Sequence, residues 1–411
     1  MCGNGVRIVH EKMDHVRSVA LGVWIEAGSA NELEGEEGIA HFIEHMLFKG
    51  TDSRTARMIA EEFDGIGGDI NAFTSKEMTC YYATVLNNHA GKALAILADM
   101  LFNSLFDEVE MTKEKSVILE EVAVVEDTPD DDVMEQLWTN MYLNQPIGRP
   151  ILGNKETIAK FDKKAIVHFM KRLYRPERIV ISVAGNYDAG LIQLIEDYFG
   201  SFTASKLNKE SIVQVPKFHS GITVKEKETE QAHIGIGFPG LATKDKRMSD
   251  LVILDSIIGG SMSSRLFQEV REERGLAYAI DSFYSSYSNG GSFIIYGGTS
   301  PEKAIELYST INSVINLFLK EGVKEKEIQN AKEQVKGGFI LGLESSESRM
   351  YRNGNNELML RSHRSVNEVI SRIDAVTKES VQEIGAYIFQ GNRATSVILP
   401  EGMFTSQDFD C

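Results

Sequence analysis

The chain has 411 residues, enough for two or three domains, and hydrophobic residues make up 42% of it, as in globular proteins with sizeable cores. The formal net charge is −17 at pH 7 and no basic footprint is present, so we expect no nucleic-acid partner. No apolar run reaches the roughly 18 residues that cross a membrane, and no secretory signal follows Met1. We therefore expect no membrane partner.

The three cysteines, Cys2, Cys80 and Cys411, form neither a CxxC pair nor a disulfide framework. Two of them stand at the ends of the sequence. Thiols used in this way are typical of a reducing compartment, so we expect the protein to be cytoplasmic.

The first part of the sequence predicts two strands and then a helix with two histidines. Residues 5–9 and 16–25 are rich in β-branched side chains, as strands are. The stretch 40–50 predicts one amphipathic helix. Because His41 and His45 lie one turn apart on the same face, their imidazoles can bind one metal ion.

Glu44 lies beside the two histidines, where a carboxylate can take a proton from a metal-bound water. The order His-x-x-Glu-His is the inverse of the commoner zinc-protease helix and is itself a metalloprotease signature. An accidental match is expected in roughly one chain in a hundred of this length. The alternative is a helix whose histidines simply lie in or near a core.

The following segments predict a second helix, two paired strands and a third helix. These are residues 55–63, 69–73, 79–86 and 89–102. The glycine run after the second helix lacks the Lys-Ser/Thr of a phosphate-binding loop, so nucleotide binding is not indicated.

A long helix that begins near Asp107 supplies a third candidate ligand. Glu114 and Glu121 are seven residues apart and share one face with Val117 and Ile118. A carboxylate on an apolar face is costly unless it is paired or binds a metal. Two histidines and one glutamate leave a fourth position open for water, as in catalytic zinc sites. The alternative for Glu121 is a salt bridge within the helix.

The second half of the sequence repeats the first. Ile166 and Phe169 recur as Val381 and Ile384, 215 positions later in both cases. The helix of the second copy that matches the metal helix, 250–258, contains no histidine, so the chemistry belongs to the first copy. We predict an N-terminal catalytic domain, a polar linker and a homologous C-terminal domain that completes the substrate chamber. Their bounds are residues 1–204, 205–217 and 218–411.

Four motifs make the whole chain resemble the pitrilysin/insulinase family of zinc metallopeptidases, the inverzincins. They are 41–45, 71–77, 117–121 and 146–153. The chain is most similar to the bacterial processing-protease branch, which is related to the mitochondrial processing peptidase β subunit. The resemblance implies an α+β fold of two homologous α/β domains. Each would have a mixed, mostly antiparallel sheet flanked by helices, and together they would form a clamshell.

The resemblance also implies the roles of the residues in the first copy. His41, His45 and Glu121 would bind one Zn²⁺ per chain, with Glu44 as the base. Glu114 matches a functional glutamate that lies one heptad before the third zinc ligand in this family.

Five further residues match substrate-binding positions of the family. Asn71 and Ala72 match a strand that binds substrate backbone as an added β-strand. Phe48 matches a residue that lines an apolar pocket after the cut, and packing in the core is its alternative. Asp131 and Glu135 match two acidic residues that recognise arginine near the cut, although both acid types differ from the family pattern.

In the second copy, Arg271 and Tyr278 resemble an Arg…Tyr pair that contacts substrate near the scissile bond when the halves close. The alternative is that they are surface and packing residues. Because this pair and the zinc motif occur in one chain, neither has to be borrowed from a partner.

We therefore predict a zinc-dependent endopeptidase that hydrolyses unfolded peptides inside a closed two-domain chamber. The resemblance suggests a homodimer. One alternative is a catalytically inactive peptide-binding or structural homologue, against which the intact zinc motif argues. The other is a different hydrolase or lyase with a His₂Glu metal, such as iron. The two-copy layout and the Arg…Tyr pair argue against it.

Overall fold

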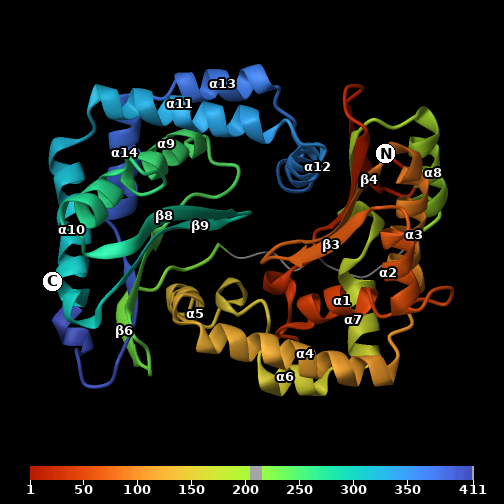
Figure 1. Cartoon of the computed structure of the whole chain (residues 1–411), viewed down its shortest axis with the longest axis horizontal. Coiled ribbons are helices and arrows are strands. Elements are labelled where there is room, and N and C mark those ends of the chain that lie inside the picture. The colour runs from red at the N-terminus through yellow and green to blue at the C-terminus, as the bar shows by residue number, and fades with distance from the viewer. Residues whose placement is uncertain (204–214, 410–411) are drawn as a thin grey trace. The chain divides into compact units, whose positions relative to one another are not determined.

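The computed structural model describes residues 1–203 and 215–409, so most of the predicted linker at 205–217 lies outside the described residues (Figure 1). The chain divides into two compact units. The described residues of the first unit are Met1–Ala123, 149–203 and Gly342–His363, and those of the second are 124–148, 215–341 and 364–409.

The first unit is built on a five-stranded sheet in the order β1-β5-β2-β4-β3. Its strands are β1 (Arg7–Lys12), β2 (Ser18–Ile25), β3 (Asp69–Thr74), β4 (Thr79–Leu86) and β5 (Ile179–Gly185). Strands β1 and β5 are parallel, and all other pairs are antiparallel. Strand β3 pairs only with β4 among the described strands, so its second edge is open.

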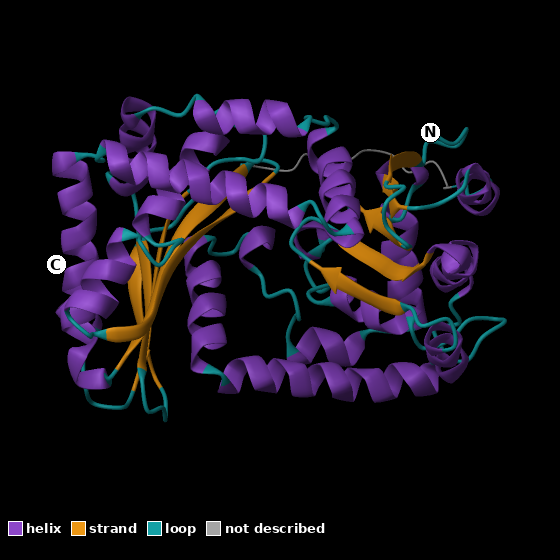
Figure 2. Cartoon of the chain, turned by 45° about the horizontal axis from the view of Figure 1, so that its top comes forward, coloured by secondary structure: helices purple, strands orange, loops and turns teal. Residues whose placement is uncertain are grey.

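Helices cover one face of this sheet and enclose the main core of the first unit (Figure 2). They are α1 (Ile39–Leu47), α2 (Ala56–Asp64), α3 (Ala90–Asn103), α7 (Lys163–Leu173) and α8 (Ala189–Phe199). The long α4 (Glu108–Asp127) and the short α6 (Lys155–Lys160) complete this part. The central strand β2 is buried along almost its whole length, which explains its continuous hydrophobic run.

The second unit repeats this sheet, in the order β6-β10-β7-β9-β8. Its strands are β6 (Gly221–Glu226), β7 (Ala232–Pro239), β8 (Ala277–Tyr287), β9 (Gly290–Thr299) and β10 (Ala394–Leu399). Again only the first pair, β6 with β10, is parallel. The predicted fold class of two α/β units with mixed, mostly antiparallel sheets is confirmed.

Five helices accompany the second sheet, and the core of this unit lies between the sheet and several of them. They are α9 (Met248–Ile258), α10 (Ala304–Glu321), α11 (Glu325–Gly342), α13 (Val366–Asp374) and α14 (Lys378–Phe389). Helix α9 occupies the place of α1 in the repeat and carries no histidine, as the sequence predicted.

The opposite face of each sheet is covered by a helix from the other half of the sequence. Helix α12 (Ser346–Asn355) packs on β2 and β5, and α5 (Pro129–Met141) packs on β7 and β10. The predicted domains are contiguous in sequence, whereas the compact units are not. Each unit includes one segment, with its helix, from the other predicted domain. We call α12 and α5 the exchanged helices.

Glycines let the exchanged helices approach the strands closely. A Cβ atom on Gly354 would lie 2.2 Å from Nε1 of the buried Trp24, and one on Gly22 would lie 2.4 Å from Sδ of Met350. The Ser182 hydroxyl on β5 donates a hydrogen bond of 2.7 Å to the carbonyl of Met350. Helix α12 thus closes a small second core on this face of the first sheet.

The same arrangement holds α5 on the second sheet. A Cβ atom on Gly237 would lie 2.2 Å from Sδ of Met141. The Asn140 side-chain amide donates to the hydroxyls of Thr223, at 2.9 Å, and Ser396, at 3.1 Å. Both units therefore depend on one helix from the other half of the sequence.

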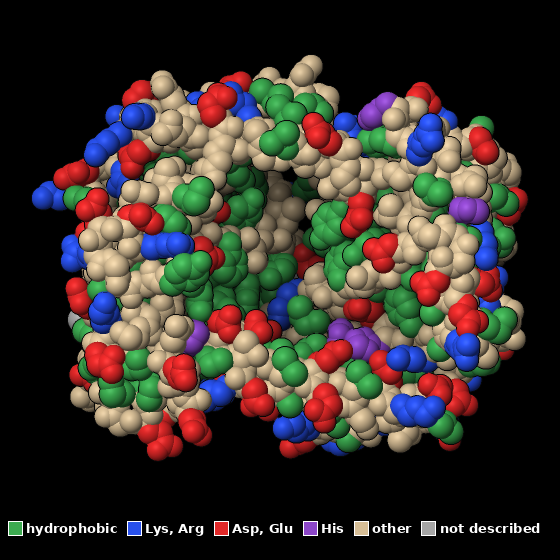
Figure 3. All heavy atoms as spheres, in the orientation of Figure 1, with side chains coloured by type: hydrophobic (Ala, Val, Ile, Leu, Met, Phe, Trp, Pro, Cys, Tyr) green, Lys and Arg blue, Asp and Glu red, His purple; other side chains and the backbone are tan. Residues whose placement is uncertain are grey.

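None of the helices in the described part of the chain combines the length and the apolar character that crossing a membrane requires. In Figure 3, acidic and basic side chains are interspersed over the viewed face.

Replacement of Gly354 by alanine tests the exchanged packing of α12. The new methyl group meets the rigid Trp24 indole, so we expect the free energy of unfolding to fall by about 1–3 kcal/mol. The matched control is Gly338→Ala in α11, where a Cβ atom meets nothing within 4 Å. At that position the higher helix propensity of alanine should raise the free energy of unfolding by up to about 1 kcal/mol. Urea denaturation followed by tryptophan fluorescence measures both, and equal effects would contradict this packing.

Candidate active site and metal centre

Helix α1 is anchored at its first turn by a buried carboxylate. Oxygens of Glu32 accept hydrogen bonds from the backbone N–H groups of Gly38, at 3.0 Å, and Ala40, at 2.9 Å. These bonds satisfy donors that a helix N-terminus otherwise leaves free. Burial raises the pKa of Glu32 to about 8, although the two backbone bonds oppose the rise. Gly38 itself has a φ of +92°, which suits a residue without a side chain.

The apolar residues of α1 pack into the core and leave three polar side chains on one side. Those in the core are Ile39, Ala40, Phe42, Ile43, Met46 and Leu47. His41 is buried, and Glu44 and His45 are half-buried. The helix ends at Leu47, so the predicted range of 40–50 extended three residues too far.

Helix α4 brings two glutamates to this side of α1. Its buried Ile118 belongs to the core, Glu114 is buried, and Glu121 is half-buried. Val117 is 45% exposed, so the predicted apolar face of this helix is not buried along its whole length. The carboxylates nevertheless reach the histidines as the seven-residue spacing predicted.

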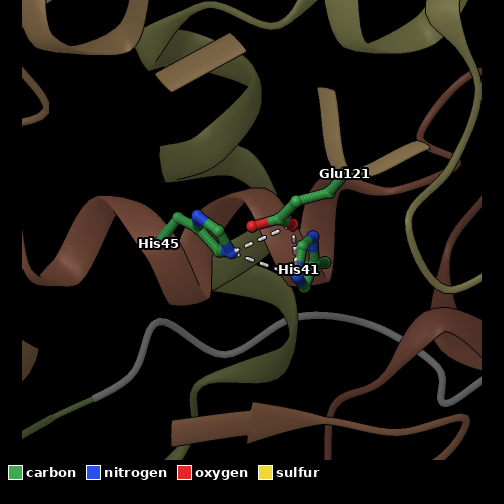
Figure 4. A group of neighbouring side chains, drawn as sticks. All are labelled: His41, His45 and Glu121. Atoms are coloured by element: carbon green, nitrogen blue, oxygen red, sulfur yellow. Dashed lines mark hydrogen bonds and ion pairs between the residues drawn. The ribbon is translucent and has the colours of Figure 1, made fainter. Parts of the chain in front are cut away.

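His41, His45 and Glu121 converge on one point (Figure 4). The Nε2 atoms of the histidines are 3.1 Å apart, and Oε2 of Glu121 lies 3.7 Å from each of them. Donor atoms at about 2.0–2.2 Å from a tetrahedral zinc ion lie about 3.4 Å from one another. These side chains therefore fit zinc in both donor type and spacing. Among residues 1–203 and 215–409, no other set of three or more His, Cys, Asp or Glu side chains is so arranged.

Glu114 orients His45 toward this point. Nδ1 of His45 donates to Oε1 of Glu114 at 2.7 Å, and Nζ of Lys49 lies 2.6 Å from the other carboxylate oxygen. With its proton on Nδ1, the imidazole presents the Nε2 lone pair to a metal. Burial raises the pKa of Glu114, but the bonds from His45 and Lys49 outweigh burial and lower it. The carboxylate therefore stays charged.

The two histidines have opposite pKa shifts. Burial and the neighbouring His45 lower the pKa of His41 to about 3, so this imidazole is neutral at neutral pH. Burial also disfavours the charged form of His45, but the hydrogen bond to Glu114 and the nearby carboxylates raise its pKa. A metal ligand has to be neutral, and His41 already meets that condition.

Glu44 is held between the helix and the sheet edge. The Thr74 hydroxyl at the end of β3 donates to Oε2 of Glu44 at 2.5 Å. Burial raises the pKa of Glu44, while the Thr74 bond and the nearby His45 oppose the rise. A raised pKa makes this carboxylate a stronger base than an ordinary glutamate, which suits it to accept a proton.

The predicted substrate strand is β3, whose outer edge is open. Asn71 is exposed and Ala72 is half-buried. Phe48 caps the C-terminus of α1 and packs against the core, with its ring centroid 6.5 Å from that of Tyr81. This packing accords with the core alternative for Phe48, and its substrate role stays a prediction.

Arg271 and Tyr278 lie together in the second unit, at a π-helical segment (Phe267–Glu273) and the start of β8. The Arg271 guanidinium stands 4.3 Å from the centre of the Tyr278 ring and donates to the Tyr278 carbonyl at 3.2 Å. Tyr278 is 80% exposed, so its hydroxyl is available to a ligand.

Asp131 and Glu135 lie on the exchanged helix α5, and Asp131 is exposed while Glu135 is half-buried. Burial and the neighbouring Asp130 raise the pKa of Asp131. Between them, the buried Asp132 is bound by Lys225 and Lys227 of the second unit, so Asp132 anchors the helix.

Three residues of this site were not singled out from the sequence: Glu32, Lys49 and Thr74. Lys49 follows His45 by one helical turn, and Thr74 lies within the recognised strand motif, so spacing and motif pointed to both. Glu32 lies in a turn-rich segment, and only its burial and its bonds to α1 identify it.

Two family models match successive parts of this chain. The model of insulinase, peptidase family M16, matches residues 7–155, and that of the peptidase M16 inactive domain matches residues 160–335. An uncharacterized zinc protease of Bacillus subtilis, YmxG, is 48% identical over 405 residues, or 98% of each chain. The chain belongs to the peptidase M16 family. The predicted insulinase-type recognition is confirmed, and the match of the second copy to an inactive domain agrees with its lack of histidines in α9.

Other members of the M16 family are also similar along almost the whole chain. A relative in Rickettsia bellii, named an uncharacterized zinc protease, is 38% identical over 97% of each chain. These relatives support a metallopeptidase that uses zinc. The crystal structure of a Helicobacter pylori protease matches with a TM-score of 0.90 at 22% identity, covering 97% of this chain and 98% of that one. The crystal structure of a peptidase M16 inactive domain from Pseudomonas fluorescens matches with a TM-score of 0.89 at 19% identity, covering 98% of each chain.

Replacement of Glu114 by glutamine tests its role behind the metal ligand. Loss of the charge next to His45 and Lys49 should weaken zinc binding by about 10–100-fold. The matched control is Glu120→Gln on the exposed side of the same helix, which should leave zinc affinity unchanged. Competition with a zinc-binding dye measures both affinities. Equal affinities of the two variants would contradict the proposed support of His45.

Proposed function

We propose that this M16 protein is a zinc-dependent endopeptidase for unfolded peptides, with one Zn²⁺ held by His41, His45 and Glu121. The observation that carries this proposal is the convergence of these three side chains beside Glu44 and the open edge of β3. When bound there, zinc would supply a water molecule of lowered pKa and would polarise a peptide carbonyl.

Glu44 is the proton carrier of the proposed reaction. Its carboxylate takes a proton from the attacking water and later gives it to the leaving amine. Burial beside the sheet raises its pKa, which makes the carboxylate a stronger base for taking the proton. The Thr74 hydroxyl keeps Oε2 in place, and the other carboxylate oxygen would take part in this exchange.

The open edge of β3 positions the substrate. An extended peptide can pair with the backbone of Asn71 and Ala72 as a sixth strand. Thr74, at the end of the same strand, donates to Glu44, so a peptide on this edge lies next to the base. Only an extended segment can pair in this way, which favours unfolded peptides over folded proteins.

Arg271 and Tyr278 are proposed to donate hydrogen bonds to the carbonyl oxygen of the scissile bond as negative charge develops on it. The two units would close around the substrate as a clamshell to bring this pair to the peptide. Asp131 and Glu135 would accept an arginine side chain near the cut, as in processing peptidases. We further propose that the protein acts as a homodimer, which light scattering after gel filtration would detect.

Hydrolysis of quenched-fluorescent peptides by zinc-loaded wild type and Glu44→Gln tests the proposal. We expect the variant to keep its zinc and to lose about 10²–10⁴-fold in kcat. The control Glu120→Gln should retain wild-type activity, and a chelator should abolish it. Equal activity of Glu44→Gln and wild type would exclude Glu44 as the base. A folded protein cleaved as fast as a peptide would contradict the preference for unfolded chains.

Replacement of Tyr278 by phenylalanine tests the second unit's part in the reaction. Loss of a donor that acts on the transition state should lower kcat by about 10–100-fold and change KM little. The matched control is Tyr387→Phe on α14, a tyrosine that is 51% exposed. Steady-state kinetics on one peptide separates the two constants. An unchanged kcat would remove Tyr278 from the mechanism.

A further inference from the structure

The two faces of the edge strand β3 have different surroundings. Ile70 and Ala72 pack against the main core, and Thr74 donates to Glu44 on that same side. Phe73 points to the opposite face, where it packs against the small core beneath α12. Any peptide paired with β3 would likewise direct alternate side chains to the two faces.

An aromatic cluster occupies the α12 face at this edge. It consists of Trp24, Phe73, Tyr82 and Tyr351. The ring of Tyr351 stacks on Phe73, with centroids 5.5 Å apart, and meets Trp24 edge-on at 4.9 Å. Tyr351 comes from the exchanged helix, so the second half of the sequence contributes it to the first sheet (Figures 1 and 2).

The packing of α12 on the sheet uses only part of Tyr351. Met350 and Gly354 already fill the contact of α12 with Gly22 and the fully buried Trp24. Tyr351 is 46% exposed, so its ring covers Phe73 with one side and leaves much of the other in solvent. Hydrophobic side chains also gather over β3 in Figure 3. An aromatic surface of this kind, next to an open strand edge, is suited to bind an apolar side chain.

The cluster lies close to the position of the proposed chemistry. Phe73 immediately precedes Thr74, whose hydroxyl holds Glu44. Neighbouring residues of a strand are about 3.3 Å apart along its axis, so a substrate residue over Phe73 is within a few residues of the cut.

We propose that Tyr351, together with Phe73, forms a subsite for an aromatic or long aliphatic substrate side chain on the α12 face of β3. This inference rests on the proposed peptidase function and on pairing of the substrate with β3. It makes Tyr351 a specificity-determining residue that lies outside the metal centre, on a helix supplied by the second half of the chain.

The test is a set of quenched-fluorescent peptides in which each of the three positions on either side of the cut is Phe, Leu, Ala or Arg in turn. Wild type should prefer Phe and Leu over Ala by about tenfold in kcat/KM at a position facing the cluster. Tyr351→Ala should lose this preference, whereas Tyr351→Phe should keep it. The control Tyr198→Ala changes a tyrosine of α8 that is 40% exposed, and it should also keep the preference.

A second variant separates a lost subsite from a damaged fold. Tyr351→Glu places a carboxylate at the same position, so its preference there should shift from Phe to Arg. A destabilised fold cannot produce such a gain. The inference is overturned if Tyr351→Ala slows all peptides equally, or if no position loses its preference. It is also overturned if Tyr351→Glu shows no shift.

Failure of the peptidase proposal would give a different result. If the zinc-loaded wild type cleaves no peptide, the proposed function fails, and fluorescence anisotropy with the same labelled peptides then tests the subsite. Tighter binding of the Phe peptide than the Ala peptide, lost in Tyr351→Ala, would support the subsite without catalysis. Equal binding of the two peptides would overturn it.

Discussion

The hydrogen bond between His45 and Glu114 is the contact on which the arrangement of the candidate metal centre depends. It joins α1 to α4, two helices whose bonded residues are 69 positions apart, at a distance of 2.7 Å. With α4 held in this register, Glu121 lies two turns farther along the same helix and meets both histidines. Lys49, just beyond the end of α1, binds the same carboxylate, and Glu32 anchors the start of that helix. Together these bonds determine where α1 and α4 place His41, His45 and Glu121.

The exchanged helices make each sheet depend on the other half of the sequence. Each sheet is completed by a helix from the other half of the sequence, and glycines on strands or helices make the close approach possible. Helix α9 of the second copy contains no histidine, yet this copy supplies α12 to the first sheet and Tyr278 to the proposed mechanism. The second half of the sequence thus contributes a helix to the unit that holds the candidate metal centre.

The sequence allowed the candidate metal centre to be predicted because its residues obey helix spacing. His41 and His45 lie one turn apart, and Glu114 and Glu121 lie two turns apart, so each pair follows from local geometry. Strand order and the exchange of α12 and α5 depend on contacts between distant segments, which residue patterns do not encode. Val117 shows the same limit, since an apolar residue on a predicted face proved to be exposed. Glu32 was missed because its role arises only when the helix meets the preceding loop. Thr74 lies within a recognised motif, but its bond to Glu44 forms only when the helix meets the sheet.

Anomalous X-ray diffraction from zinc-loaded crystals at the zinc edge tests the central claim most directly. The account predicts one strong peak per chain, at about 2.0–2.2 Å from Nε2 of His41, Nε2 of His45 and a carboxylate oxygen of Glu121. The Nδ1–H of His45 should remain bonded to Glu114. A peak at another place, or one that leaves Glu121 outside the coordination shell, would contradict the account.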